Sequence, residues 1–174
     1  MEDIKSLIRT IPNFPKEGIE FRDLTTLFLD GKGFQKTVSR MADAYRGQPI
    51  DKIVGIESRG FILGAPMALE LGVGFVPVRK PNKLPGERIG VEYTLEYGVD
   101  RLEIHSDALT KGERVLIVDD LLATGGTMEA ACRLVEQVGG AIIGCAFVVE
   151  LTDLKGRDKL TNYPIFKLID FEGE

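Results

Sequence analysis

The chain has 174 residues, of which 44% are hydrophobic and 28% are charged, a composition typical of a globular protein with a sizeable core. Its net charge of −5 argues against a general nucleic-acid binder or a protein of anionic membranes, because both usually carry a basic surface. The N-terminus lacks an apolar run of signal-peptide length, and no segment has the length of a membrane span. We therefore expect one cytoplasmic domain covering residues 1–174.

Helices and strands alternate in the N-terminal half of the chain. Ile4, Leu7 and Ile8 predict a short amphipathic helix. A second apolar stripe at helical spacing predicts another helix, on Phe34, Val38, Met41, Ala42 and Tyr45. Residues 52–56 then predict a strand, residues 61–71 a helix and residues 74–78 the next strand, an order that favours parallel pairing through a right-handed crossover.

The turn after the strand at 52–56 is a candidate anion site made of Glu57, Ser58, Arg59 and Gly60. Backbone N–H groups and the Arg59 guanidinium could bind a diphosphate, and Gly60 would permit close approach of the ligand. The structural alternative is that Ser58 only caps the following helix.

Residues 79–88, with the sequence RKPNKLPGER, hold four cations and one acid. Two prolines and a glycine oppose regular structure there, so we expect a mobile basic loop, although such a charge run is often only solvated surface. Beyond it, Val91, Tyr93, Leu95 and Tyr97 alternate with polar residues, and a second alternating run surrounds Leu102 and Ile104. This pattern predicts an antiparallel hairpin, either a cover for a site or a decoration of the sheet edge.

Residues 115–118, four apolar residues in a row, predict a central parallel strand buried on both faces. Asp119 and Asp120 then stand at its carboxyl end, where open α/β sheets bind their ligands. The loop that follows, Ala123-Thr124-Gly125-Gly126-Thr127, can hold a phosphate with its backbone N–H groups, with Thr127 as a helix cap. Two carboxylates can accept hydrogen bonds from adjacent sugar hydroxyls, so the string predicts a sugar-phosphate site; a plain strand-to-helix turn is the alternative.

The C-terminal third continues the α/β pattern. Ala131, Leu134, Val135 and Val138 predict a helix that ends at Gly139-Gly140, and residues 141–149 and 165–169 predict two further strands. Cys132 and Cys145 have no His or Cys at metal-ligand spacing. The fold class expected is α/β, with a central, mainly parallel sheet flanked by helices.

The string from Val115 to Thr127 resembles the phosphoribosyl-pyrophosphate signature of the type I phosphoribosyltransferases, and its LLATGGT ending is most similar to the adenine branch of that family. Four further strings are similar to the same branch and occur in the same order. They are FPKEGIEFRD from Phe14, ESRGF from Glu57, RKPNKLPG from Arg79 and LEYG from Leu95.

This resemblance implies a small N-terminal hood at about residues 1–30 and a flexible hairpin lid at about residues 79–105. It implies a purine salvage transferase that converts adenine and 5-phosphoribosyl-1-pyrophosphate to AMP and pyrophosphate. Mg²⁺ would be the cofactor, held mainly by substrate oxygens and not by protein ligands. The expected assembly is a homodimer, with no nucleic-acid or membrane partner.

The resemblance also assigns roles to individual residues. It makes Glu96 and Arg59 catalytic, with Glu96 handling a proton of the purine. The adenine contacts would be Glu20, Phe21, Arg22 and Tyr97. The pyrophosphate contacts would be Glu57, Ser58, Arg59, Arg79, Lys80 and Lys83, with Arg79 or Lys80 reaching a neighbouring subunit. The ribose and 5′-phosphate contacts would be Asp119, Asp120, Ala123, Thr124, Gly125, Gly126 and Thr127.

Two alternatives remain open from the sequence. One is a purine-responsive regulator that keeps the phosphoribosyl-pyrophosphate site without turnover, against which the lack of an evident DNA-binding appendage argues. The other is an enzyme for hypoxanthine, guanine or xanthine, whose 6-oxo group calls for a cationic donor that we do not place in this sequence.

Overall fold

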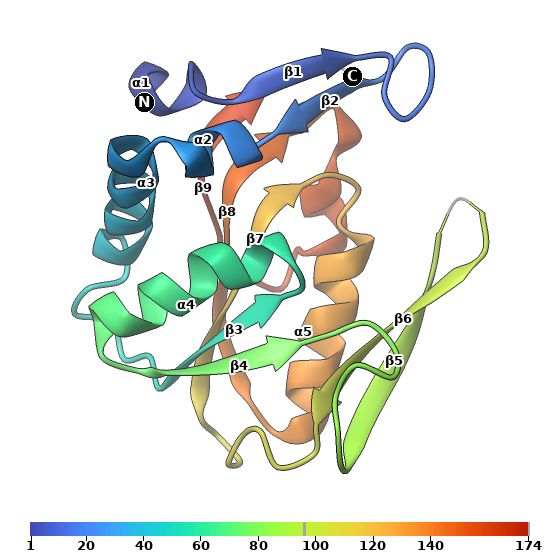
Figure 1. Ribbon diagram of the computed structural model, residues 1–174. Helices are drawn as coiled ribbons and strands as arrows, with labels where there is room; N and C mark the ends of the chain where they lie inside the picture. The colour runs from blue at the N-terminus through green and yellow to red at the C-terminus, as the bar shows by residue number, and fades with distance from the viewer. Residues whose placement is uncertain (96, 174) are drawn as a thin grey trace.

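A five-stranded parallel sheet forms the centre of the molecule in the computed structural model, which describes residues 1–95 and 97–173. The strand order is β4-β3-β7-β8-β9, and each neighbouring pair is parallel (Figure 1). The strands are β3 (Lys52–Ile56), β4 (Gly74–Val78), β7 (Arg114–Leu122), β8 (Ala141–Leu151) and β9 (Ile165–Phe171). The predicted α/β class is confirmed, and β3 and β4 have the predicted bounds.

The central strand β7 is longer than its sequence pattern predicted. The apolar run ends at Val118, but β7 keeps its pairing with β8 as far as Leu122, opposite Glu150. Asp119 and Asp120 therefore lie inside the last part of the strand and not beyond it. The sheet ladder fixes the backbone of both acids, since β8 hydrogen-bonds to this part of β7.

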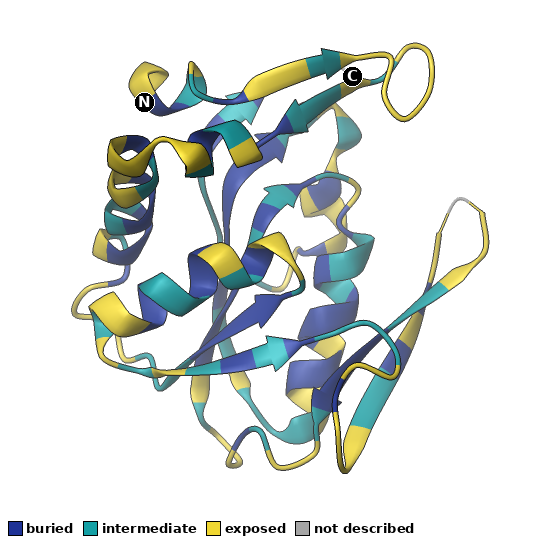
Figure 2. Cartoon of the chain, viewed as in Figure 1, coloured by how far each residue is buried: buried dark blue, intermediate teal, exposed yellow. Residues whose placement is uncertain are grey.

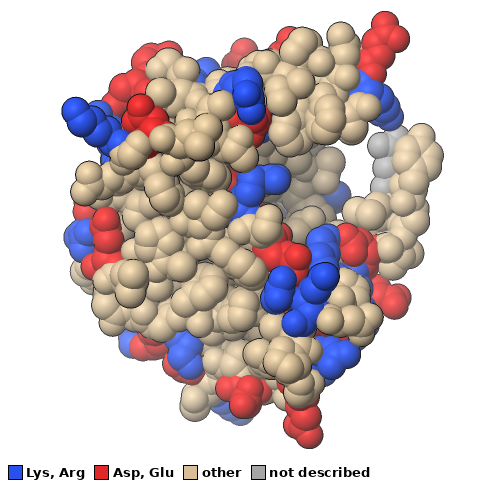
Figure 3. All heavy atoms as spheres, viewed as in Figure 1, with Lys and Arg blue, Asp and Glu red and all other residues tan. Residues whose placement is uncertain are grey.

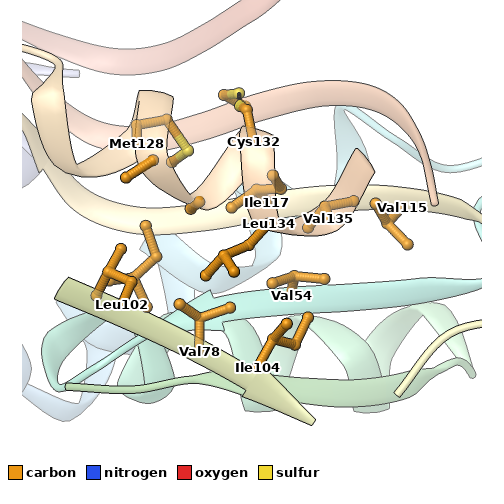
Figure 4. Packing of buried hydrophobic residues seen from close by; sticks show 14 of the residues in the cluster. Val54, Val78, Leu102, Ile104, Val115, Ile117, Met128, Cys132, Leu134 and Val135 are labelled. Carbon is orange, nitrogen blue, oxygen red and sulfur yellow. Dashed lines mark hydrogen bonds between the residues drawn. The ribbon is translucent and has the colours of Figure 1, made fainter. Parts of the chain in front are cut away.

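Three long helices cover the two faces of the sheet. Helices α3 (Gly31–Asp43) and α4 (Arg59–Leu71) pack on one face, and α5 (Gly126–Val138) packs on the other. Successive residues of β7 alternate between these layers, as a parallel strand buried on both faces requires. Leu116 and Val118 pack with α3 and α4, whereas Val115 and Ile117 pack with α5 (Figure 4).

The predicted end of α5 is also found, whereas α4 begins at Arg59, before the predicted residue 61, and α3 ends before Tyr45. Gly139 follows α5 with φ +104°, a left-handed conformation that a glycine adopts at little cost, and it ends the helix as expected.

No helix among residues 1–95 and 97–173 is long and apolar enough to cross a membrane.

The predicted antiparallel hairpin is formed by β5 (Arg88–Thr94) and β6 (Val99–His105). One face of it is part of the core, because Leu102 and Ile104 are fully buried beside α5 and β4 (Figure 4). Its tip projects away from the sheet and is exposed at Leu95 and Tyr97 (Figure 2). The hairpin is therefore both a packing element beside β4, an edge strand of the sheet, and a projection; that it covers a site stays a prediction.

The N-terminal region differs most from the sequence prediction. Helix α1 covers only Glu2–Lys5, so Ile4 lies in it while Leu7 and Ile8 follow it in a turn; Ile4 and Ile8 are nevertheless buried. The chain then forms the antiparallel pair β1 (Arg9–Pro12) and β2 (Glu20–Asp23) and the short helix α2 (Thr25–Leu29), none of which was predicted. These elements lie above the carboxyl ends of the sheet strands (Figure 1).

Two short 3₁₀ helices connect β8 to β9. They are η1 (Thr152–Leu154) and η2 (Gly156–Lys159), and Leu160 after them is buried in the core on the α5 side. This connection passes directly behind the loop between β7 and α5, where Gly156 meets the backbone of that loop.

Candidate functional site

Asp119 and Asp120 stand side by side at the carboxyl end of β7 in different surroundings. Asp120 is buried, and its Oδ2 accepts a hydrogen bond from Arg59 Nε at 2.5 Å. Burial alone would lower the pKa of Arg59, but the charge of Asp120 outweighs it and the pKa is raised. Asp119 accepts only the backbone N–H of Asp120, at 2.9 Å, among the described hydrogen bonds. Its burial and the neighbouring Asp120 charge raise its pKa well above the usual range of aspartate.

The loop after β7, residues 123–127, which we call the phosphate loop, has the backbone of an anion site. Gly125 adopts φ +86° and is the residue that precedes the first turn of α5. The helix begins at Gly126, so the prediction that Thr127 caps it is wrong: the left-handed turn at Gly125 starts the helix before Thr127, which lies within its first turn. The unpaired N–H groups at the start of α5 and the positive end of its dipole favour a bound anion.

A cavity of about 150 Å³ joins this loop to the two acids. Asp119, Asp120, Ala123, Thr124, Gly125 and Thr127 line it together with Arg59, Leu121, Leu122, Met128 and Phe147. The structure thus brings together all the residues predicted for ribose and 5′-phosphate except Gly126, which follows Gly125 in the chain but is not among the lining residues described.

A second cavity, of about 350 Å³, opens from the same acids toward the loop between β3 and α4. It is lined by Glu57, Ser58, Arg59, Lys80, Asp119, Asp120 and Thr127, four of which also line the first cavity. Ser58 stands at the cap position of α4 but forms no side-chain capping bond, so the purely structural explanation of Ser58 is not supported.

Gly60 lets the start of α4 approach β7. A Cβ atom at this position would lie 2.8 Å from the carbonyl oxygen of Val118 and 3.2 Å from Asp119 Oδ1. Only glycine fits at this position, because any Cβ atom would clash with β7. Gly60 therefore allows the loop of residues 57–60 to lie next to Asp119, close to the phosphate loop.

The side chain of Glu57 turns toward the basic segment of residues 79–88 and not toward the shared acids. It accepts hydrogen bonds from Arg79 Nε at 3.1 Å and from the backbone N–H of Lys80 at 2.7 Å. Lys80 in turn binds Asp100 and the Tyr93 hydroxyl, and the Asp100 contact raises the pKa of Lys80 against the opposing effect of burial. The root of the segment is therefore held in place by acids.

Glu103 of β6 holds the rest of the segment. It is 4% exposed and accepts hydrogen bonds from the Asn82 backbone N–H at 2.8 Å, from Arg88 Nε at 3.2 Å and from Arg101 Nε at 3.2 Å. Of the four cations, Arg79, Lys80 and Arg88 thus have acid partners, while Lys83 is exposed and lines neither cavity among the described contacts. Whether the segment is mobile stays a prediction.

The residues predicted to contact the base, Glu20, Phe21, Arg22 and Tyr97, are not among the described residues that line the two cavities. Phe21 packs edge-on against Phe14, with ring centroids 5.2 Å apart. Arg22 stacks its guanidinium 4.4 Å from the Phe171 ring centre and pairs with Glu20 at 2.9 Å. Asp23 at the end of β2 adds to the negative charge that raises the pKa of Arg59.

The hairpin tip stands away from the cavities. Tyr97 is 81% exposed there, so the structure does not bring it to the shared acids, and Glu96 lies outside the described residues. Figure 3 shows an opening between this projection and the rest of the molecule, bordered by side chains of both charges. The sequence did not single out Asp100 and Glu103, the acids of β6 that bind the basic segment. The one signal in the sequence was the presence of these two acids in the second alternating run, after a stretch rich in cations.

Comparisons with known proteins give one consistent result. The model of the phosphoribosyl transferase domain family matches residues 27–173. The adenine phosphoribosyltransferase of Desulfosudis oleivorans is 56% identical over 172 residues, which cover 99% of each chain. The crystal structure of adenine phosphoribosyltransferase from Thermoanaerobacter pseudethanolicus superimposes with a TM-score of 0.95 at 55% identity, covering 98% of this chain and 99% of that one.

A third match was solved with ligands. The adenine phosphoribosyltransferase of Saccharomyces cerevisiae, in complex with an imino-altritol bisphosphate and adenine, has a TM-score of 0.91 and 47% identity, with 97% of each chain covered.

Proposed function

Because the chain belongs to the phosphoribosyltransferase family, in its adenine branch, and is therefore a transferase, we propose that it salvages adenine by converting it to AMP with 5-phosphoribosyl-1-pyrophosphate as the sugar donor. One observation carries the choice of donor. Two anion-type loops, at 57–60 and 123–127, open onto the same pair of carboxylates. A ligand with a monophosphate at one end, a diol in the middle and a diphosphate at the other matches that order of groups.

In the proposed reaction, N9 of adenine forms a bond to C1 of the ribose while the bond from C1 to the pyrophosphate oxygen breaks. The electron pair of the broken bond leaves with pyrophosphate, and the N9 proton is lost. The sugar passes through a cation-like state, which Asp119 and Asp120 are proposed to stabilise by binding its hydroxyls. Arg59 and Lys80, which line the second cavity, are proposed to stabilise the charge that the leaving diphosphate gains. Glu96 is proposed, on the resemblance, to accept the proton.

We propose that Mg²⁺ enters bound to the pyrophosphate donor, as part of the substrate. No group of three His, Cys, Asp or Glu side chains suited to a metal occurs in the part of the chain that the structure describes. Asp120 is already engaged by Arg59, which supports a metal held mainly by substrate oxygens. When bound, the ion neutralises charge on the leaving pyrophosphate.

The compartment and assembly are proposals as well. Cys132 and Cys145 are buried, and their sulfur atoms lie 3.7 Å apart at hydrogen-bonding distance. The proposed compartment is the cytoplasm, as expected from the sequence. A twofold homodimer is the commonest symmetric assembly and the one expected from the resemblance.

A single assay tests the proposed function. The purified protein is given 5-phosphoribosyl-1-pyrophosphate, Mg²⁺ and each purine in turn, and nucleotide and pyrophosphate are measured. We expect AMP from adenine, no comparable product from guanine, hypoxanthine or xanthine, and loss of turnover on chelation of Mg²⁺. Comparable efficiency with guanine, or no turnover with any base, would refute the proposal.

A further inference from the structure

The phosphate loop offers its anion backbone N–H groups and two threonine hydroxyls, of Thr124 and Thr127, but no cation of its own. Among the described residues that line the 150 Å³ cavity, Arg59 is the one cation, and its Nε is engaged by Asp120 at 2.5 Å. A phosphate in this cavity therefore depends on the N–H groups of residues 123–127, on the Thr124 and Thr127 hydroxyls and on the start of α5. Such donors are effective only when the loop keeps the right shape, because hydrogen bonds weaken steeply with distance and angle.

The connection between β8 and β9 touches the phosphate loop from behind. The carbonyl oxygen of Gly156 lies 2.5 Å from the place where a Cβ on Gly125 would stand. In return, a Cβ on Gly156 would stand 2.5 Å from the carbonyl oxygen of Ala123 and 2.8 Å from the side chain of Leu122. Two backbones meet here with no room for a side chain on either, so the position of Gly156 determines how far back the loop can lie.

An ion pair and a buried anchor hold Gly156 in that position. Arg157 donates from Nε to one oxygen of Glu150 at 2.6 Å and from Nη2 to the other at 2.8 Å. Glu150 is 5% exposed and belongs to β8, opposite Leu122 of β7. Leu160, at the other end of η2, is 1% exposed in the core. The segment is thereby fixed to β8, the sheet neighbour of the strand β7 that leads into the phosphate loop.

We propose that Gly156 and Arg157 are positioning residues for binding of the 5′-phosphate. Gly156 supports the phosphate loop from behind, and Arg157 keeps Gly156 in place through Glu150. The ligand class concerned is a phosphate monoester on a sugar, so the inference rests on the proposed function and extends it to a segment that does not touch the substrate. Neither residue is among the lining residues of the two cavities in the described chain.

Gly156→Ala is the direct test. Its methyl group would need about 1 Å of movement to reach ordinary contact distance from the Ala123 carbonyl, and a shift of that size in a binding group costs about 10- to 100-fold in substrate use. We expect KM for 5-phosphoribosyl-1-pyrophosphate and Kd for ribose 5-phosphate to rise by that factor, with KM for adenine unchanged. Gly74→Ala is the control, because its Cβ would have only ordinary contacts, the nearest at 3.6 Å.

A second variant keeps the test decisive if Gly156→Ala does not fold. Arg157→Met leaves Gly156 intact but removes both bonds to the buried Glu150, so the same two constants should rise, by a smaller factor. Arg46→Met is its control, because Arg46 forms an exposed ion pair with Glu70 far from the site. Unchanged constants in both variants, or equal losses for adenine and the sugar phosphate, would overturn the inference.

The two proposals can fail separately. If the wild-type protein makes no AMP, the proposed function fails, while calorimetry with ribose 5-phosphate still measures the effect of Gly156→Ala on phosphate binding. If the wild type is active and the variants keep its constants, only the positioning role fails.

Discussion

Two neighbouring aspartates of β7 differ in what the fold does to their charge. Asp120 has a cation at 2.5 Å, whereas Asp119 has burial and a like charge beside it, which raise its pKa. An aspartate with a raised pKa in the folded protein costs stability once it is ionised, because folding then favours the protonated form. The protein keeps this unfavourable group at the site where a ligand with hydroxyl donors would bind it.

Asp119→Asn should therefore stabilise the free protein while weakening its function. Its stabilising effect should be present at pH 7 and should shrink as the pH falls toward and below the ordinary pKa of aspartate, where the wild-type group is neutral both folded and unfolded. Use of 5-phosphoribosyl-1-pyrophosphate should weaken by about 1–3 kcal/mol, the scale for hydrogen bonds to charged groups. Thermal melts across pH and steady-state kinetics measure the two effects.

Asp120→Asn is the matched comparison. It should weaken donor use by about the same 1–3 kcal/mol but bring no gain in melting temperature, because Arg59 loses its charged partner. A lower melting temperature together with wild-type kinetics, in either variant, would show that the carboxylates are structural.

Glu96→Gln tests the proton acceptor that the resemblance assigns. The amide keeps the size of the side chain and loses its basicity, so turnover should fall by about 10²- to 10⁴-fold, the usual range for general acid–base catalysis. AMP binding and the melting temperature should stay close to wild type. Glu92→Gln, an exposed acid of β5, is the control. Full turnover in Glu96→Gln would exclude the assigned role.

At the scale of elements, the hairpin of β5 and β6 joins the core to the basic segment. The inner face of the hairpin packs with α5. Glu103 on β6 accepts hydrogen bonds from the Asn82 backbone N–H and from the side chains of Arg88 and Arg101. Burial would raise the pKa of Glu103, but the Asn82 N–H and the two arginines outweigh it and the pKa is lowered. Glu103 thus adds a second charged attachment between β6 and the segment of residues 79–88, beside the pair of Lys80 and Asp100.

Glu103→Gln should loosen that segment without unfolding the hairpin. The amide keeps one acceptor oxygen but loses the charge that binds Arg88 and Arg101, so amide hydrogen exchange in residues 79–88 should become faster while exchange in α5 stays slow. Because the folded pKa of Glu103 is lowered, the same release should occur in the wild type as the pH falls through that pKa. Equal exchange in variant and wild type at neutral pH would disprove the attachment.

The strands and helices of the sheet could be predicted because their apolar patterns are strong and local. The fully apolar run at 115–118 is buried, and so are Val91, Tyr93, Leu102 and Ile104 of the alternating runs. The alternation fails only at the hairpin tip, where Leu95 and Tyr97 are exposed. The continuation of β7 through Asp119 and Asp120 could not be predicted, because two acids ordinarily end a strand and only pairing with β8 keeps these in the ladder.

The N-terminal elements escaped prediction for a related reason. In β1, residues 9–12 alternate poorly and end in Pro12, and β2 is four residues long, so their pairing depends on contact with the rest of the molecule. Most predicted ribose-phosphate and pyrophosphate residues lie together, because they follow the carboxyl ends of neighbouring parallel strands. The contact of Gly156 with the phosphate loop left no trace in the local sequence beyond a glycine.

For the whole molecule, the layering dictates where a ligand can bind. One face of the sheet is closed by α3 and α4 and the other by α5 and the hairpin, each over a separate cluster of buried side chains. Both cavities that share Asp119 and Asp120 lie at the carboxyl edge of the strands. The N-terminal strands β1 and β2 lie above this edge (Figure 1).

The homodimer expected from the resemblance has a simple test. Sedimentation or light scattering should give twice the 19.2 kDa mass of the chain at micromolar concentration. Arg79 and Lys80 bind Glu57 and Asp100 of their own chain, so a role for either in a partner's site requires that ion pair to open. A monomer with full activity over that concentration range would contradict both the assembly and the shared site.

The order of the strands in the sheet also bears on how the protein is made. Strands β3 and β4 can pair as soon as residues 52–78 have left the ribosome. The other edge of β3 pairs with Val115 to Val118 of β7, which are synthesised about sixty residues after β3. Until β7 is made, the apolar strand β3 has an unpaired edge, and such an edge can pair with other chains and lead to aggregation. Synthesis speed and chaperone supply should therefore affect the yield of this protein more strongly than changes at its exposed hairpin tip.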